Sequence, residues 1–347
     1  MSAGVLPASA PIPAVRLVFL WHEALAIALL LGAMSLGKHS ISLLIGLGLL
    51  LWSLRNCASV YQTLSLLVPL STLSWQFSPD PAGFDSRLKW LIIFLASGSA
   101  VLHSLHAYLA ARERRALGLP AWLLTFLLFL GMVAVLAVVY SRSTELSLFK
   151  LVTFAVGVVG LMAACSDPRL HIAYCLSWLF TLHVVVLAIS LLLIPLGKGY
   201  LPGTHYLMGV FNQSQAMGLF LVPFTTLLLV KWFTTRSQLT RLELVTCLAG
   251  MAAIYLTHSR TAAMSVLASL GIILLLGLWR ATPEHQLFRR RFLPAAIVLV
   301  LLVVVADSFT GGRLTESAMG FINKGGVQVQ SVLASREDKF IEAYDAF

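Results

Sequence analysis

Three polar segments interrupt an otherwise apolar sequence, and the shortest places an arginine at the edge of an apolar run. The turn at 257–263 contains His258, Ser259 and Arg260, followed by small residues. A guanidinium group drawn toward a bilayer without a partner costs several kcal/mol, whereas it can hold a phosphate through two parallel hydrogen bonds. We interpret Arg260 as a phosphate ligand; the alternative is an arginine that snorkels to lipid head groups.

The second segment, 197–218, combines several glycines with amide side chains at the edge of an apolar run. It carries Asn212, Gln213 and Gln215, and His205 lies earlier in the same segment. Amides are neutral donors and acceptors, so they suit sugar hydroxyls or a phosphate oxygen. The alternative is that they only cap the helix that follows.

The third segment lies in the polar tail and begins at Ser335 and Arg336. Taken alone it is a charged helix start with Ser335 as N-cap, and a solvated face is its simplest interpretation. The apolar residues that follow, up to Phe347, fall on one helical face. Because this pattern ends without a cap, we expect the natural chain to continue beyond Phe347.

The amino-acid composition indicates which class of protein carries these three polar segments. Of the 347 residues, 59% are hydrophobic and 11% are charged, and the mean hydropathy is +0.90. Soluble domains carry about 25% charged and about 45–50% apolar residues, so a water-soluble enzyme and a disordered chain are both excluded. Since lipid cannot satisfy open backbone groups, the spanning segments must be helices.

We predict an all-α polytopic membrane protein with about eleven transmembrane helices. A short tail, 1–16, precedes a transmembrane domain at 17–309, and 310–347 begins a larger loop. The expected spans are 17–36, 40–54, 58–77, 88–110, 121–140, 147–165, 171–196, 216–233, 243–257, 261–279 and 292–309.

Clustered arginines predict the orientation of these spans. Basic clusters follow the fourth, eighth and tenth spans, at 112–115, 236–241 and 280–291. Because all three follow even-numbered spans, one orientation places them all in the cytoplasm. The N-terminus is then cytoplasmic, and 197–215, 258–260 and 310–347 face the exterior.

Neither the net charge nor the cysteines indicate another class of function. The charge of +10 fits cationic cytoplasmic loops, and no basic stripe with interleaved aromatic residues indicates nucleic-acid binding. Cys57, Cys165, Cys175 and Cys247 form no C-x-x-C pair. We interpret them as buried thiols rather than as zinc ligands or disulfides.

The three polar segments, in this order, resemble motifs of the O-antigen ligase and polymerase superfamily of bacterial envelope enzymes. The family carries a Gly-x-x-x-Asn/Gln-Pro-Asn loop, a Ser-Arg-Gly/Ala turn and an Arg-x-x-x-Trp-x-x-Ala helix. This chain has Gly-Val-Phe-Asn-Gln-Ser-Gln at 209–215 and Ser-Arg-Thr-Ala at 259–262. In the third motif Arg336 is followed by Phe340 in the tryptophan position and by Ala343. The resemblance covers roughly residues 200–347.

The resemblance implies transfer of a glycan from undecaprenyl diphosphate to an acceptor hydroxyl at the periplasmic face of the inner membrane. It implies that Arg260 and Arg336 are catalytic and stabilise the leaving diphosphate, with no metal and no cofactor. In a ligase the acceptor is lipid A–core. The expected substrate-binding residues are Asn212, Gln213, Gln215, Ser259, His258 and His205.

The chain departs from the family pattern at the expected base. The family's histidine follows the Arg-x-x-x-Trp helix, and this sequence ends at Phe347. Either the sequence is a fragment, or this member lacks that base. His258 and His205 lie on the exterior side of the predicted topology and are weak candidates to replace it.

The sequence is also compatible with other functions. An O-antigen polymerase or a protein O-oligosaccharyltransferase would use the same donor with another acceptor. A solute transporter would explain the polar residues inside the spans, and a non-catalytic membrane scaffold would need no site.

Overall fold

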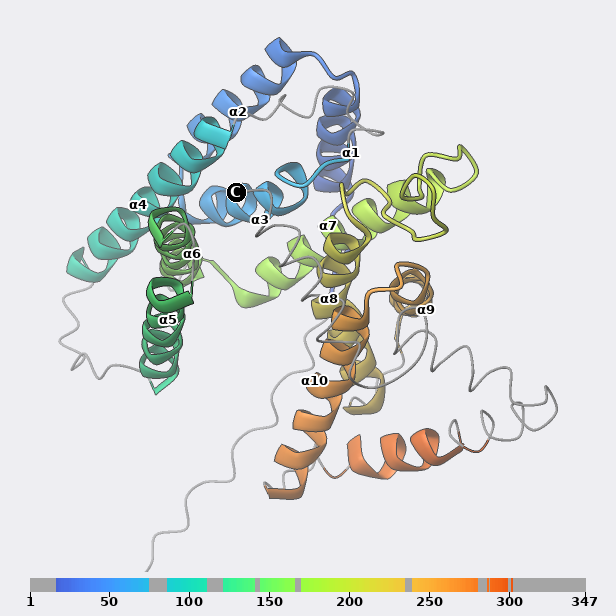
Figure 1. Cartoon of the computed structure of the whole chain (residues 1–347). Helices are drawn as coiled ribbons and strands as arrows, with labels where there is room; N and C mark the ends of the chain where they lie inside the picture. The colour runs from blue at the N-terminus through green and yellow to red at the C-terminus, as the bar shows by residue number, and fades with distance from the viewer. Residues whose placement is uncertain are drawn as a thin grey trace, which may run out of the picture. The chain divides into compact units, whose positions relative to one another are not determined.

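The structure is a computed structural model that describes residues 17–74, 86–110, 121–140, 144–165, 170–234, 239–279, 286, 288–298 and 301. These residues are predominantly helical and include no β-strand, which confirms the all-α prediction. A further helical segment at 288–298 follows ten helices. The ten helices, labelled in Figure 1, are α1 (Trp21–Ser35), α2 (His39–Ser53), α3 (Cys57–Leu70), α4 (Ser86–Ala110), α5 (Ala121–Tyr140), α6 (Thr144–Cys165), α7 (Ile172–Leu192), α8 (Ser214–Thr234), α9 (Arg241–Leu256) and α10 (Arg260–Trp279).

Four helices are long and apolar enough to cross a membrane. The qualifying segments are Leu88–His106 in α4, Ser147–Cys165 in α6, Ile172–Leu192 in α7 and Ser214–Phe233 in α8. The sequence predicted about eleven such spans. Helices α1 and α2 have 15 residues each and are therefore about 22 Å long, less than the ~30 Å hydrocarbon core.

Local capping explains why several helices are shorter than the apolar runs that contain them. The run predicted at 58–77 ends as a helix at Leu70, where the Thr72 hydroxyl donates to the Val68 carbonyl at 2.9 Å. The run at 171–196 ends as a helix at Leu192 and continues as turns up to Gly197, which adopts a left-handed φ of +68°. Hydrophobicity alone could not locate these ends.

The chain divides into two compact units by its internal contacts. Unit 1 comprises residues 1–200 and 208–213, and unit 2 comprises 201–207 and 214–347. Helices α1–α7 belong to unit 1, and α8–α10 belong to unit 2. The segment predicted as one exterior loop at 197–215 therefore contributes to both units.

In unit 1, α4 and α6 pack closely through small residues. A Cβ atom placed at Gly160 of α6 would lie 2.7 Å from the Cα atom of Ser97 of α4. The Ser104 hydroxyl of α4 donates to the carbonyl of Ala163 in α6 at 2.5 Å. Small residues let helix backbones approach and add interhelical hydrogen bonds where lipid supplies no hydrophobic driving force.

In unit 2, α8 contacts both α9 and α10. Lys231 of α8 forms an ion pair with Glu243 of α9, whose side chain is 1% exposed. Further along the same interface Gly250 of α9 faces Thr225 of α8. The α8–α9 contact thus combines a close backbone approach with a buried charge pair.

Several sequence predictions concern the ends of the chain or single cysteines. The tail at 1–16 and the segment at 310–347, which includes Arg336, lie outside the described residues. Cys57, Cys175 and Cys247 are buried as predicted, whereas Cys165, the last residue of α6, is exposed.

Candidate functional site

The turn between α9 and α10 is held by hydroxyl groups and ends on Arg260. The Thr257 hydroxyl donates to the Ile254 carbonyl at 2.7 Å and accepts from the Ser259 amide at 3.3 Å. Ser259 then accepts from the Ala262 amide at 3.3 Å and so caps α10. Ser259 is 1% exposed, and its hydroxyl has a structural task in this turn.

Arg260 is the first residue of α10 rather than part of a loop. Its side chain is half-buried, and its Nη2 atom is buried without a hydrogen-bond partner among the described residues. Leaving a buried charged donor unsatisfied costs more than an average hydrogen bond contributes. An anionic oxygen is the acceptor that a guanidinium donor binds most strongly.

The N-terminal ends of α8 and α10 lie beside each other in unit 2. Gly218, in the second turn of α8, faces the cap of α10: a Cβ placed there would lie 2.7 Å from the Ser259 Cβ and 3.0 Å from the Ala262 Cβ. Figure 1 shows α8 and α10 running side by side. Helix N-termini carry partial positive charge and unpaired amides, so this arrangement adds to the positive charge of Arg260.

A short hairpin, formed by residues 201–207, covers the C-terminal end of α9. The Leu201 amide donates to the Tyr206 carbonyl at 2.9 Å, and the Leu207 amide donates to the Leu256 carbonyl of α9 at 2.9 Å. The Tyr206 ring lies 4.7 Å from the His258 ring, centroid to centroid. The hairpin therefore satisfies the Leu256 carbonyl at the C-terminal end of α9, beside the N-terminal ends of α8 and α10.

His258 and His205 occupy different environments at this end of unit 2. His258 has a left-handed φ of +50° and also lies against Tyr255, with ring centroids 6.0 Å apart. Its ring is thus oriented by two tyrosines, while the side chain stays exposed. His205 is exposed on the hairpin.

The amide cluster is divided between the two units. Gln215 is exposed in the first turn of α8, three residues before Gly218 and hence on the same helical face. Asn212 and Gln213 are exposed in unit 1. The structure thus places Gln215 at the same end of unit 2 as Arg260, His258 and Ser259, and it describes Asn212 and Gln213 as part of the other unit.

The loop that carries Asn212 is anchored firmly within unit 1. The Asn212 amide donates to the Thr72 carbonyl at 2.7 Å, and the Val210 amide donates to the Ser190 hydroxyl at 3.2 Å. Gly209 adopts a left-handed φ of +58°, and a Cβ there would collide with Ser190. The glycine of the family-like motif is therefore required by backbone conformation and by close packing.

Three contributors to the site were not predicted from the sequence: Tyr206, Tyr255 and Gly218. A glycine near the start of an apolar helix is a signal for close helix approach, so Gly218 could have been found. The aromatic contacts to His258 follow from hairpin geometry and have no sequence signal. Among the described residues, no group of three or more His, Cys, Asp or Glu side chains is placed to hold a metal ion.

Replacing Gly218 with alanine is expected to destabilise unit 2 by about 1–3 kcal/mol, because the added methyl group would overpack the α10 cap. The matched control is Gly271→Ala in α10, where an added Cβ meets no atom within 4 Å. This control should be neutral or slightly stabilising, since alanine favours helix. Thermal unfolding in detergent measures both; equal unfolding temperatures for the two variants would contradict the close contact.

Comparisons of the chain with family models, with curated proteins and with solved structures give no match.

Proposed function

We propose that this protein is a polytopic inner-membrane enzyme that transfers a glycan from undecaprenyl diphosphate to a lipid A–core hydroxyl at the periplasmic face. The observation that carries the proposal is the buried Nη2 atom of Arg260, which lacks a partner among the described residues where two helix N-termini adjoin. A diphosphate supplies the anionic oxygens that such a site requires. The motif resemblance supplies the reaction class.

The proposed transfer forms one bond to the anomeric carbon and breaks another. The acceptor hydroxyl oxygen attacks the anomeric carbon of the glycan, the bond from that carbon to the diphosphate oxygen breaks, and lipid diphosphate leaves with the electron pair. Arg260, together with Arg336 from the tail, stabilises the negative charge that develops on the diphosphate. The acceptor proton passes to a base to which we assign no described residue.

The amides and His258 have binding roles in this proposal. Gln215 is exposed at the start of α8 and can exchange hydrogen bonds with sugar hydroxyls, as Asn212 and Gln213 can from their own unit. His258 and His205 extend the polar surface at the end of unit 2. Ser259 acts indirectly, by fixing the backbone from which Arg260 projects.

The proposed membrane topology has about eleven spans, a cytoplasmic N-terminus and a periplasmic segment at 310–347. In an alternating topology, the even-numbered helices begin on the same side of the membrane, where α3 ends. The support is that some of these helix ends are neighbours within their own unit. In unit 1 the C-terminal end of α3 and the N-terminal part of α4 line one cavity together with residues 150–161 of α6. In unit 2 the N-terminal ends of α8 and α10 adjoin.

A solute transporter is the second candidate, and one cavity favours it. A space of about 530 Å³ in unit 1 is lined by His22, Glu23 and Gln62 among apolar residues. Gln62 accepts from the Trp52 indole at 2.9 Å and donates to the Tyr174 hydroxyl at 2.7 Å. Polar groups inside apolar helices are costly and commonly mark a solute path or an interhelical contact.

Reconstitution of the full chain into liposomes tests both candidates. Vesicles receive undecaprenyl-diphosphate-linked glycan with lipid A–core, with a glycan repeat or with a peptide as acceptor, and parallel vesicles receive labelled sugar for uptake. We expect glycan on lipid A–core. Product on the repeat alone would identify a polymerase, and product on the peptide alone an oligosaccharyltransferase. Uptake without transfer to any acceptor would reject the transferase proposal in favour of transport.

A further inference from the structure

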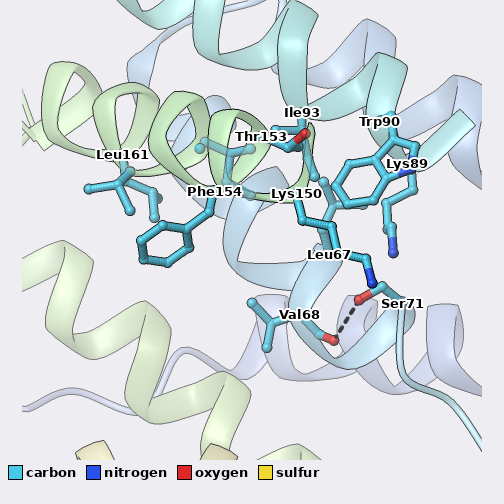
Figure 2. A pocket seen from close by; sticks show the side chains of 13 residues that line it. Leu67, Val68, Ser71, Lys89, Trp90, Ile93, Lys150, Thr153, Phe154 and Leu161 are labelled. Carbon is cyan, nitrogen blue, oxygen red and sulfur yellow. Dashed lines mark hydrogen bonds between the residues drawn. The ribbon is translucent and has the colours of Figure 1, made fainter. Parts of the chain in front are cut away.

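A second site lies in unit 1, in an apolar groove between α3, α4 and α6. Its volume is about 380 Å³, which falls in the ~300–1,000 Å³ range of small-molecule sites. The walls are formed largely by hydrocarbon side chains, among them Leu67, Ile93, Phe154 and Leu161. Gly157 leaves part of the α6 wall without a side chain. Figure 2 shows these residues around the groove.

Two lysines stand at one end of this apolar groove. Lys89 lies near the start of α4 and Lys150 near the start of α6, and both line the cavity together with Ser71, which follows α3. Figure 2 shows both ammonium groups at the same end, beside Ser71. The Lys89 ammonium also lies 4.6 Å from the centre of the Trp90 ring.

The positive charges of Lys89 and Lys150 have no negative counter-charge among the described residues that line the groove. No acidic side chain lines the groove in the part of the chain that the structure describes. The two ammonium groups stand at the same end of the groove, and like charges that lie near each other repel. An anion placed between them would replace this repulsion with two attractions.

The position of the lysines along their helices corresponds to a membrane interface. Lys89 is the second residue of the candidate span Leu88–His106, and Lys150 is the fourth residue of the candidate span Ser147–Cys165. The ends of such spans lie at the depth of lipid phosphates, where tryptophans such as Trp90 are also enriched. The groove runs from these lysines along the apolar part of the same helices.

We infer that this groove binds a lipid whose head group ends in a phosphomonoester or a diphosphate. The hydrocarbon chain lies along α3, α4 and α6, and the phosphate oxygens bind Lys89 and Lys150, with the Ser71 hydroxyl within the same end of the site. Two close lysines match a head group with about two negative charges better than a zwitterionic one. Basic pockets between transmembrane helices bind phosphorylated lipid head groups in this manner.

This inference is independent of the proposed glycan transfer. Lys89 and Lys150 belong to unit 1, whereas Arg260 belongs to unit 2, and lipid binding can be measured without an acceptor or a transfer reaction. Loss of one activity therefore says nothing about the other.

Binding of the full chain in nanodiscs to phosphatidic acid, measured by native mass spectrometry or fluorescence, tests the charged end of the site. We expect Lys89→Gln and Lys150→Gln each to weaken binding about fivefold, and the double variant about thirtyfold. The corresponding arginine variants should retain binding. Lys38→Gln is the matched control, because Lys38 lies at the N-cap of an apolar helix of unit 1, α2, but does not line the groove.

The apolar wall is tested separately by Gly157→Leu. The nearest atom to an added Cβ at Gly157 is the Ile93 Cγ2 at 3.8 Å, so the backbone accepts a side chain whose outer atoms enter the groove. We expect this variant to lose phosphatidic acid binding while keeping both lysines. Gly131→Leu, in α5 where an added Cβ has no neighbour within 4 Å, should bind normally.

Further ligands distinguish the source of the phosphate. Undecaprenyl phosphate should bind at least as well as phosphatidic acid, whereas phosphatidylglycerol and phosphatidylcholine should bind at least fivefold more weakly. Inorganic phosphate at millimolar concentration should not compete. Equal binding of phosphatidylcholine, effective competition by inorganic phosphate, or an undiminished double lysine variant would overturn the inference and leave two lysines that only snorkel to the bilayer surface.

Discussion

Arg260→Ala is expected to lower the rate of glycan transfer by about 100- to 1,000-fold, the effect of removing one preorganised donor that stabilises developing negative charge. The Arg260 guanidinium has a buried nitrogen without a partner among the described residues, at the adjoining N-terminal ends of α8 and α10. Removing it leaves the helix ends in place but deletes the full charge. Initial rates of transfer from undecaprenyl-diphosphate-linked glycan, measured in liposomes, check this result.

Two further substitutions show whether the effect is specific to the charge at this site. Arg260→Lys should retain partial activity, because it keeps the charge but loses the forked donor geometry. Arg241→Ala is the matched control: Arg241 is likewise the first residue of a helix, α9, but its side chain is exposed. Normal transfer by Arg260→Ala, or an equal loss in both alanine variants, would contradict the role of Arg260. From the motif resemblance, we expect Arg336→Ala to match Arg260→Ala.

Glu243→Ala is expected to destabilise unit 2 by about 3–5 kcal/mol, because it leaves the Lys231 ammonium largely buried without its carboxylate. The two side chains are 1% and 15% exposed, respectively. Glu243 also accepts from the Thr240 amide at 2.9 Å and so completes the capping box of α9. The loss should appear as a lower unfolding temperature in detergent.

A cap variant and a double variant separate the two contributions of Glu243. Thr240→Ala removes the capping hydroxyl but keeps the ion pair, so it should cost only about 0.5–2 kcal/mol. Lys231→Met combined with Glu243→Leu removes both charges and should be much less destabilising than Glu243→Ala alone. If Thr240→Ala matched Glu243→Ala, helix capping rather than the buried pair would explain the loss.

Hydrophobicity predicted the helical class, the place of each helix and, for several helices, the length. The predicted spans at 121–140 and 147–165 agree closely with α5 and α6. Helices α1 and α3 are shorter than the spans predicted at 17–36 and 58–77, and a capping box of Asn56 and Ser59 fixes the start of α3. Such caps depend on one or two hydrogen bonds. A hydropathy averaged over a window of the sequence does not detect them.

The division into two units and the local structure of the candidate site required tertiary information. The short turn with an arginine at 257–263 was visible in the sequence, and the structure places Arg260 beside the start of α8. The sequence could not show that Ser259 is consumed by capping. Nor could it show that residues on either side of the peptide bond between 207 and 208 belong to different units, because nothing in their composition changes there.

The close packing of α6 on α4 limits which residues can occupy position 160. Because the Ser97 Cα atom itself would lie 2.7 Å from a Cβ at Gly160, shrinking Ser97 to glycine would not make room for a larger neighbour. Any residue other than glycine at this position must push the helices apart. The spacing of α4 and α6, which both line the groove that we assign to a phospholipid-like ligand, thus depends on a residue that has a hydrogen atom in place of a side chain.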